Sequence, residues 1–556
     1  MLRGWVSRSE LVYGTRKVSP TIRKDSVLPP ASRGSLKIVD VASARRKSAK
    51  RLAPIPVANG VEAALESQAP RPSLSDHWLS RCTRWEINME ITALFLSRLQ
   101  FAFTVSFHII FPAFTVGLAA WLTFLEALDL RSGRPLYRRL FDFWLKIFAV
   151  AFGLGVVTGI VMAFQFGTNW SELSLRTGPI QGPLLGYESF TAFALEASFF
   201  GVMIFGRSRV PPWFYLFACG MVTLGTSLSS FWIMVNNSWM QWPVGYEIDA
   251  NGIFIPTDWG AIIFSPVVWV RFPHMILAAY ITTCFCVAAT GAWYLLERRL
   301  RIEGVAMVRM GLGLAAVLVP VQLFFGHLTG DYVHDKQPAK FAAIEGRWEN
   351  ERPASEIVIA LPDEVEEKNY YDISIPYLGS LIGSMSFSSE EVGLKSFPVD
   401  QRPPVLIPFF AFRIMVGCGL LMLGLAWYGT WLGFTGRLAE VRWMTWCVFF
   451  SFPLGFIATL TGWFTAEVGR QPWAVYGVLR TAEAVTPSLT VQQVAISFFA
   501  FAVIYSSIAI AGIAYVYRML HTGPDATPHE IGEGANPKRP LAVPGGSPGT
   551  PPSAVE

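Results

Sequence analysis

The feature that most constrains this 556-residue chain is a series of long apolar stretches. A helix needs roughly 20 predominantly apolar residues to cross a hydrocarbon core about 30 Å thick. Only 15% of the residues are charged, against about 25% in soluble domains. The sequence therefore predicts an all-α polytopic membrane protein and excludes an ordinary soluble globular one. About nine transmembrane helices are expected, near 95–125, 147–167, 188–206, 213–235, 272–296, 305–326, 408–432, 443–463 and 488–516.

The rest of the chain divides into parts of different composition. Residues 1–88 are rich in Pro, Ser, Ala and Arg and hold the chain's basic excess, which is typical of a disordered segment. Met89 then opens MEITALFLSRLQFAFTV as a natural start would, so we expect a disordered N-terminal extension or a true start near Met89. The expected order from there is helices 1–6 at 89–326, an outer loop at 327–407, helices 7–9 at 408–516 and a disordered tail at 517–556.

Arginine and lysine in the short loops predict the orientation, because cytoplasmic loops carry an excess of these residues. They concentrate after the first, third, fifth and seventh stretches, as in RSGRPLYRR after the first and ERRLRIEG after the fifth. Those loops are therefore expected in the cytoplasm. The N-terminus and the loop at 327–407 then lie on the outer side, and the C-terminus lies in the cytoplasm.

His108 lies in the middle of the first apolar stretch, in FTVSFHIIFPAF. An ionisable side chain at membrane depth costs at least ~2.5–3.5 kcal/mol, so each one suggests a function. Neutral imidazole is a common ligand of haem iron, although a lone core histidine is more often structural. Covalent c-type haem and Cys-based zinc or redox sites are excluded, because the six cysteines form no C-x-x-C or C-x-x-C-H.

His274 and Met415 are predicted at the same depth, near the outer face. His274 opens the fifth stretch in VRFPHMILAAY, and Met415 begins the seventh in FRIMVGCG. A His/Met pair is a recognised haem ligation, whereas a Met among apolar residues is usually packing. The matching depth and the neighbouring Arg413, suited to a haem propionate, favour the ligand role.

Glu188 and Glu196 share the third stretch, GYESFTAFALEASFFG. On a helix they are about 80° and about 12 Å apart. Apolar surroundings raise carboxyl pKa values, which lets such groups hold or relay protons. A buried ion pair is the alternative, but no Lys or Arg of the predicted membrane interior is at hand.

Two further pairs lie near the outer ends of the helices. Glu467 and Arg470 follow the eighth stretch in GWFTAEVGRQPW, where the carboxylate could be a ligand or proton donor and capping is the structural alternative. Lys340 and Glu345 lie in QPAKFAAIEGRWEN of the outer loop. On a helix they are about 140° out of phase, so no simple i,i+4 pair is implied. Taken alone, this second pair would most simply be solvated surface.

Together these motifs resemble subunit I of the cytochrome bd quinol oxidases. The resemblance runs from about Met89 to the end of the ninth stretch, with blocks LSRLQFAF, FQFGTNW, WMQWP, AAIEGRWE, FRIMVGCG and AEVGRQPW in the expected order. GRQPW is the most specific of them. The resemblance implies a terminal oxidase that oxidises membrane quinol, reduces dioxygen to water and generates a proton motive force without pumping.

The resemblance also implies cofactors and their ligands: low-spin haem b, high-spin haem b and haem d. His274 and Met415 match the axial ligands of the low-spin haem b, with Arg413 beside it. His108 matches the histidine of the high-spin pair and Glu467 the carboxylate at the other high-spin haem. Which of these two positions holds haem d stays open.

The other matched residues are implied to act in proton and electron supply. Glu188 and Glu196 match acidic residues that deliver protons to oxygen, and Trp463 matches an aromatic residue between haems. Arg470 belongs to the matched GRQPW block. Lys340 and Glu345 match the quinol-binding residues of the family's Q-loop.

Two details of this sequence depart from some relatives. The loop between Glu345 and Arg413 is short, which resembles the cyanide-insensitive branch, and Ala163 stands in MAFQFGTNW where some relatives have Glu. The implied setting is the bacterial cytoplasmic (inner) membrane. The implied partners are a second subunit of related fold, a small single-helix subunit, membrane lipid, quinol and dioxygen, with no nucleic acid.

Two other classes of protein fit parts of this pattern. A haem b membrane anchor would pass electrons between quinone and a partner without reducing oxygen, but it would use His/His pairs and would not need acidic groups near His108. A secondary transporter would use buried carboxylates for proton coupling, but it predicts paired halves with broken helices. No such internal symmetry is seen in the sequence.

Overall fold

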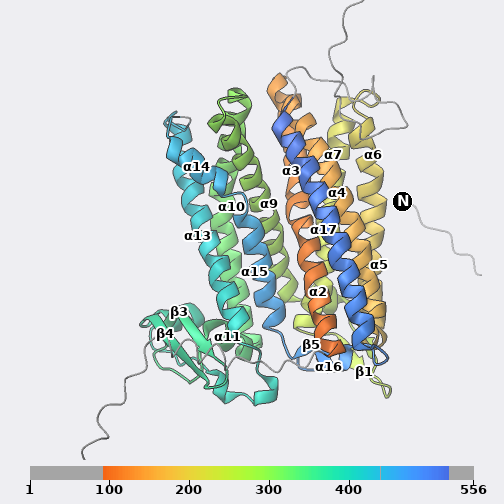
Figure 1. The fold of residues 1–556 in the computed structure, drawn as a ribbon, viewed down its shortest axis with the longest axis vertical. Helices are drawn as coiled ribbons and strands as arrows, with labels where there is room; N and C mark the ends of the chain where they lie inside the picture. The colour runs from red at the N-terminus through yellow and green to blue at the C-terminus, as the bar shows by residue number, and fades with distance from the viewer. Residues whose placement is uncertain (1–91, 439, 525–556) are drawn as a thin grey trace, which may run out of the picture. The chain divides into compact units, whose positions relative to one another are not determined.

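The computed structural model describes residues 92–438 and 440–524. The predicted N-terminal extension, the start at Met89 and most of the predicted tail lie outside the described residues. Within the described part, nine helical segments are long and apolar enough to cross a membrane. They run side by side as a bundle (Figure 1), which confirms the predicted all-α polytopic class.

The first span is two helices rather than one. α2 (Ala93–Ile110) ends just before Pro112, and α3 (Pro112–Ser132) begins there. Proline has no N–H to continue the helical ladder, but it is well suited to the first position of a new helix. The prediction of one continuous span at 95–125 missed this break. His108 lies in the last turn of α2, directly before it.

The next three spans are α4 (Pro135–Thr168), α5 to α6 and α7 (Pro212–Gln241). α5 (Ser171–Thr191) continues through a π-helical segment, η2 (Ala192–Ala197), into α6 (Ser198–Phe205). Glu188 lies in α5 and Glu196 in η2. Because a π-helical turn holds more residues than an α-helical turn, the ideal angle expected between these carboxyls does not apply.

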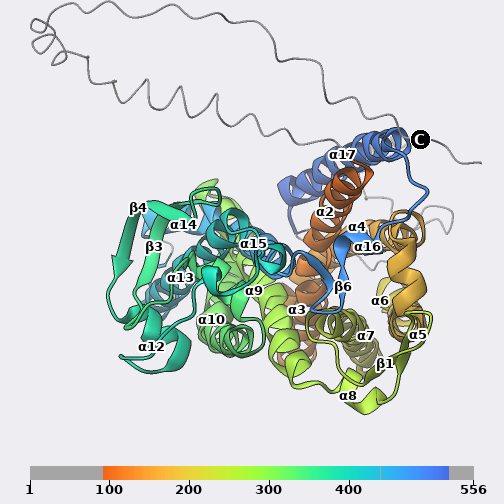
Figure 2. The same cartoon turned by 90° about the horizontal axis from the view of Figure 1, so that it is seen from below.

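α9 (Pro266–Leu296) lies at the centre of the bundle. It packs on α3 and α7 on one side, as Figure 2 shows. On the other side it packs on α10 (Arg301–Lys336), α14 (Arg442–Phe450) and α15 (Leu454–Val468). Gly291 of α9 and Gly304 of α10 let the two backbones meet. A Cβ at Gly291 would lie 2.7 Å from the Gly304 carbonyl oxygen, so a larger residue would push the helices apart.

The last three spans are α13 (Leu406–Phe434), the broken pair α14 (Arg442–Phe450) and α15 (Leu454–Val468), and α17 (Val491–Thr522). α17 begins with a capping box in which Thr490 and Gln493 exchange bonds. It ends at Thr522 rather than near 516, so the first residues of the predicted tail are helical.

The loop between α10 and α13 is folded and starts at Gln337, ten residues later than the predicted 327. This 337–405 loop lies at the end of the bundle where β5 (Trp473–Val475) and α16 (Thr481–Ala484) also lie (Figure 1). Its elements are α11 (Pro338–Glu345), β3 (Glu356–Asp363), β4 (Lys368–Ile375), α12 (Leu378–Ser384), η3 (Leu394–Ser396) and η4 (Val399–Gln401). β3 and β4 form an antiparallel hairpin with Glu356 opposite Ile375.

The remaining described elements are short connections between spans. They are β1 (Tyr246–Ile248), β2 (Phe254–Pro256), α8 (Trp259–Ile263), β5 (Trp473–Val475), β6 (Leu479–Arg480) and α16 (Thr481–Ala484).

Candidate functional site

His108 of α2 is held by a threonine of α4. His108 Nδ1 lies 3.0 Å from Thr158 Oγ1, and that hydroxyl donates to the Leu154 carbonyl at 2.9 Å. With its proton directed to Leu154, the hydroxyl accepts from His108 Nδ1–H. The proton is thereby fixed on Nδ1, which leaves Nε2 with the lone pair that a metal needs.

His274 of α9 has one ring nitrogen without a partner. Its Nε2 lies 3.3 Å from the Gln322 amide nitrogen of α10, whereas Nδ1 is buried and unpartnered among the described residues. Gly326, one turn further along α10, faces the ring, and a Cβ there would lie 3.3 Å from His274 Cε1. An orphaned buried imidazole nitrogen fits a missing ligand partner.

Met415 of α13 faces α15 at Gly462. A Cβ at Gly462 would lie 2.9 Å from the Met415 sulfur, so only glycine leaves the thioether this room. Gly159 gives similar room to His108, since a Cβ there would lie 3.1 Å from His108 Cε1. Each of the three predicted haem-ligand side chains on α2, α9 and α13 therefore faces a glycine. Trp463, next to Gly462 on α15, is half-buried.

Arg413 fastens the 337–405 loop to α13. Its guanidinium donates to the backbone carbonyls of Ile344 at 2.8 Å, Phe409 at 3.1 Å and Val358 at 3.0 Å, and also to that of Ile357. It also stacks 3.5 Å from the centre of the Phe409 ring. In this arrangement the donors expected to face a haem propionate are used by the loop backbone.

Glu467 lies at the centre of a polar network between α7 and α15. Its Oε2 pairs with Arg470 Nη2 at 2.6 Å, and its Oε1 accepts from Asn237 at 2.9 Å and Gln241 at 3.2 Å. Arg470 is buried and keeps two donors, Nε and Nη1, without a partner among the described residues. A buried cation with free donors fits an acidic group such as a propionate.

Lys340 of α11 joins the same network. Its Nζ donates to Gln241 Oε1 at 3.0 Å and to the Ala466 carbonyl at 2.9 Å. Burial, followed by the nearby positive charge of Arg271, lowers the pKa of Lys340 to about 7. Arg271 lies on α9 and donates to the side chains of Asn237 and Ser238 on α7. At neutral pH Lys340 is therefore able to exist as a neutral amine or as an ammonium.

Glu345 ends α11 on a different side from Lys340. It is 4% exposed, and its Oε2 has no hydrogen-bond donor among the described residues. The segment is helical, and Lys340 and Glu345 do not pair with each other, in agreement with their spacing.

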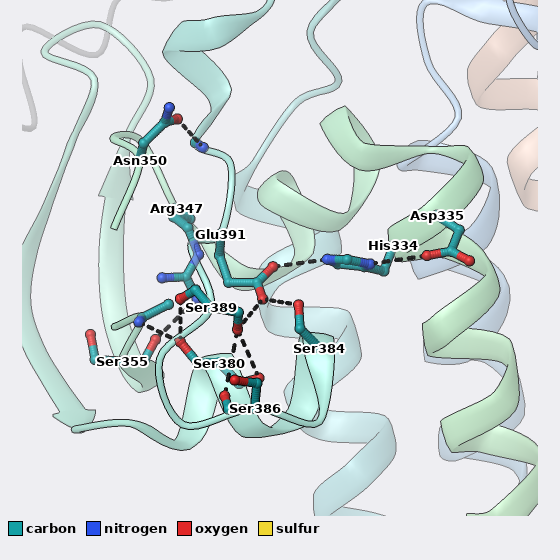
Figure 3. Close-up of polar contacts among 12 residues, drawn as sticks. His334, Asp335, Arg347, Asn350, Ser355, Ser380, Ser384, Ser386, Ser389 and Glu391 are labelled. Carbon is teal, nitrogen blue, oxygen red and sulfur yellow. Dashed lines mark hydrogen bonds and ion pairs between the residues drawn. The ribbon is translucent and has the colours of Figure 1, made fainter. Parts of the chain in front are cut away.

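A second polar cluster ties the 337–405 loop to the end of α10 (Figure 3). Glu391 of the loop accepts from Ser384 at 2.6 Å and lies 2.9 Å from His334 Nε2 of α10. Although burial opposes ionisation, the bonds from His334 and Ser384 lower the pKa of Glu391. Arg347 spans the same region by donating to Glu351 and to the Ser355 carbonyl. The loop is thus anchored at both α10 and α13.

Glu188 and Glu196 both face α7. Ser229 donates to Glu188 Oε1 at 3.1 Å, and Glu196 packs on Gly225, where a Cβ would lie 2.7 Å from Glu196 Cγ. Neither carboxyl forms an ion pair within residues 92–438 and 440–524. Both therefore match the expected unpaired carboxyls, although nothing in their contacts places them beside His108.

Sequence reasoning missed several members of these sites. Gln241 lies in the WMQWP block, which signalled the region but not its role, and Asn237 lies one turn before it. Thr158 carried no signal, because its partner is 50 residues away. Among the described residues no group of three or more His, Cys, Asp or Glu side chains could hold a bare metal ion.

The fold and site define a helical membrane protein of the haem-binding class. The family model for cytochrome bd terminal oxidase subunit I matches residues 96–524. The cytochrome bd ubiquinol oxidase subunit 1 of Bacillus subtilis is 34% identical over 457 residues, which cover 79% of this chain and 96% of that protein. The cytochrome bd-II ubiquinol oxidase subunit 1 of Escherichia coli is 32% identical over 504 residues, covering 78% and 98%.

A solved structure agrees with these sequence relatives. The bd oxidase from Geobacillus thermodenitrificans has a TM-score of 0.72 and 27% identity, covering 78% of this chain and 99% of that one. The chain belongs to the cytochrome bd terminal oxidase subunit I family. It is the haem-bearing catalytic subunit of a quinol oxidase, and as a subunit I it works with a second subunit. The family favours this function over the haem b anchor that does not reduce oxygen.

Proposed function

We propose that His274 and Met415 hold a low-spin haem b, and that His108 and Glu467 serve the two high-spin groups, one haem b and one haem d. The orphaned His274 nitrogen, the Nδ1 proton of His108 and the three facing glycines support these assignments. When bound, these groups supply the electron transfer and dioxygen reduction that amino-acid side chains cannot perform. Trp463 lies beside Gly462 and so adjoins the proposed low-spin site.

We propose that quinol is oxidised beside α11, between Lys340 and Glu345. Oxidation of a quinol releases two protons, so the site needs groups that accept them. Lys340 can accept one because its pKa is about 7. Oε2 of the buried Glu345 carboxylate, which has no hydrogen-bond partner among the described residues, can accept another. We also propose that this chain belongs to the short-loop, cyanide-insensitive branch, which the shortness of the loop that carries these residues supports.

The observation that carries this proposal is the continuous set of contacts from Lys340 through Gln241 to Glu467 and Arg470. It links the proposed quinol residue to the proposed carboxylate at the oxygen-reducing centre. Gln241 is 2% exposed and bonds both partners. Such a network fixes the two sites relative to one another in buried surroundings.

We propose that Glu188 and Glu196 hold protons taken up from the cytoplasm for dioxygen reduction, while quinol protons leave at the outer face. The basic loops predict that the 337–405 loop is outside and the C-terminus inside. Charge then separates across the membrane without a pump. Each charge moved stores ~2.3 kcal/mol per 100 mV.

We propose a bacterial cytoplasmic membrane location, with a second subunit of related fold, a small single-helix subunit and lipid around the bundle. Only 11% of the apolar window of α17 is buried within this chain, against 67% in the span that contains α9. α17 therefore offers a large apolar face to lipid or to such a partner.

A reduced-minus-oxidised spectrum of the purified oxidase, paired with oxygen consumption driven by quinol and by an artificial electron donor, tests this function. We expect low-spin haem b and chlorin bands together with both activities. Colourless folded protein would refute the haem assignments. Full quinol activity in a Lys340→Met, Glu345→Gln double variant would refute the quinol site.

A further inference from the structure

The β3–β4 hairpin of the 337–405 loop has one packed face and one exposed face. Residues that pair across an antiparallel hairpin share a face, and successive residues of a strand alternate between the two faces. Ile357 and Ala360 of β3 are buried, and both belong to one apolar core cluster with Ala342 and Ala343 of α11. One face of the hairpin therefore packs on α11.

The opposite face of the hairpin is apolar and exposed. Ile359 of β3 pairs with Ile373 of β4, and their exposed fractions are 57% and 61%. Two residues further along the strands, Leu361 and Ile375 are exposed as well. Asp372 is adjacent to Ile373 in the strand and therefore points to the other face. An exposed apolar face of this kind marks a surface that meets a partner or a membrane.

Arg413 fixes the level of this hairpin along the bundle. Its Nε donates to the carbonyls of Ile357 and Val358, each at 3.0 Å, so the start of β3 is level with Arg413 on α13. The 29 residues of α13 span about 43 Å, which is longer than the ~30 Å hydrocarbon core. Arg413 lies about 10 Å from Leu406, the first residue of the helix. The start of β3 therefore lies near the boundary between hydrocarbon and headgroups.

The hairpin also lies at the edge of the helix bundle. It is beside one end of α13 in Figure 1 and outside α13 and α14 in Figure 2. Over the same turns α13 exposes the apolar side chains of Ile407, Phe410 and Ile414. α17, which we propose faces lipid or a partner subunit, lies at a different edge (Figure 2). The hairpin is therefore situated where the apolar surface of the bundle meets the headgroups.

The charges of the hairpin are arranged as a lipid interface requires. The turn at 363–368 carries five charged side chains. Within residues 356–375, the charged residue on the exposed face of the strands is Glu356, and its Oε1 lies 3.5 Å from Arg413 Nη2. Tyr371 and Tyr377 are exposed near this face, and tyrosine is enriched at membrane–water interfaces. The strands thus offer apolar side chains while the turn offers charge.

We propose that the exposed face of the β3–β4 hairpin lies in the headgroup region of the leaflet at this end of the bundle, with phospholipid as its partner. Ile359 and Ile373 enter the boundary between headgroups and acyl chains, and the charged turn at 363–368 stays in water. Because its other face packs on α11, the hairpin lies between α11 and the lipid. This inference does not depend on the haem or quinol assignments.

Photo-crosslinking of the intact oxidase in phospholipid nanodiscs tests this contact. The photoreactive amino acid p-benzoylphenylalanine is placed at position 373 by amber suppression, and the adducts formed on irradiation are identified by mass spectrometry. We expect a phospholipid adduct in a yield similar to that from the same probe at Leu420, an exposed residue in the middle of α13. The haem spectrum should match the wild type.

Val365 is the matched control, because it is apolar and 92% exposed but lies in the charged turn. The same probe at position 365 should give about tenfold less phospholipid adduct than at position 373. A phospholipid yield at 373 no greater than at 365 would overturn the inference. An adduct at 373 with the second subunit, or with another copy of this chain, in place of phospholipid would also overturn it.

Ile359 provides a second position on the same face. If the probe at position 373 prevents assembly with haem, it is moved to position 359, which pairs with Ile373 across the hairpin. The phospholipid adduct is expected there too, and its absence from an assembled oxidase would refute the lipid contact.

Discussion

Replacing Thr158 by valine should loosen the haem held by His108. The two residues are nearly the same size, so the change removes the hydroxyl and little else. Thr158 is 1% exposed, and its Oγ1 accepts from His108 Nδ1 at 3.0 Å. A buried donor left unsatisfied costs about 1–3 kcal/mol. Since 1.4 kcal/mol is tenfold in affinity, haem binding at His108 should weaken roughly 10- to 100-fold, as is usual when a ligand's supporting hydrogen bond is lost.

The assay is haem retention. Thr158→Val oxidase is purified, incubated with an excess of a haem-binding acceptor protein, and followed by the high-spin bands of its spectrum. Those bands should decay faster than in the wild type while the low-spin haem b signal persists. Thr158→Ser keeps the hydroxyl and should behave as the wild type.

Thr123→Val is the matched control for this prediction. Thr123 also bonds a carbonyl of its own helix, at 3.1 Å, and a partner on another helix, Thr223, at 2.8 Å. The control therefore loses the same kinds of bond without touching an imidazole. High-spin haem loss that is equal in Thr158→Val and Thr123→Val would show that Thr158 does not orient a haem ligand.

Three other substitutions test the remaining assignments. Met415→Leu should abolish the low-spin haem signal and leave the high-spin haems, measured by the reduced-minus-oxidised spectrum; an unchanged low-spin signal would contradict the ligand role. Glu345→Ala should lower quinol oxidation at least tenfold but spare oxygen reduction with an artificial donor, and equal loss of both would count against the quinol site. Lys340→Arg should remove the ionisation near pH 7 from the quinol pH profile, because burial lowers the pKa of the lysine to about 7 while a guanidinium stays charged; an identical profile would exclude Lys340 as the titrating group.

The 337–405 loop is held at two separate points, which restricts the movement of the proposed quinol-binding residues. Arg413 ties α11 and β3 to α13, and the Glu391–His334 contact ties the later part of the loop to α10. Lys340 and Glu345 lie on α11, whose residue Ile344 accepts one of the Arg413 bonds. Rigid support of this kind keeps reacting groups in position, which is how a site gains rate from orientation.

Some of this protein follows from the sequence alone. Lipid offers no hydrogen bonds to the backbone, so membrane spans must be long apolar helices, and their number and order could be predicted. The cost of burying ionisable groups likewise singled out His108, Glu188 and Glu196. The same reasoning could not find the break at Phe111 or the π-helical segment around Glu196, because hydropathy reports length and polarity and not helix geometry.

The contacts between elements were decided only by the tertiary structure. Hydrophobic period places a side chain on a face of its own helix, but it does not say which distant residue packs there. Lys340 meets Gln241 across 99 residues of chain and His108 meets Thr158 across 50. Arg413, expected at a propionate, turned to backbone carbonyls of the loop. Glu356 resembles any exposed loop glutamate in sequence, and only the tertiary structure brings its Oε1 to 3.5 Å from Arg413 Nη2 of α13.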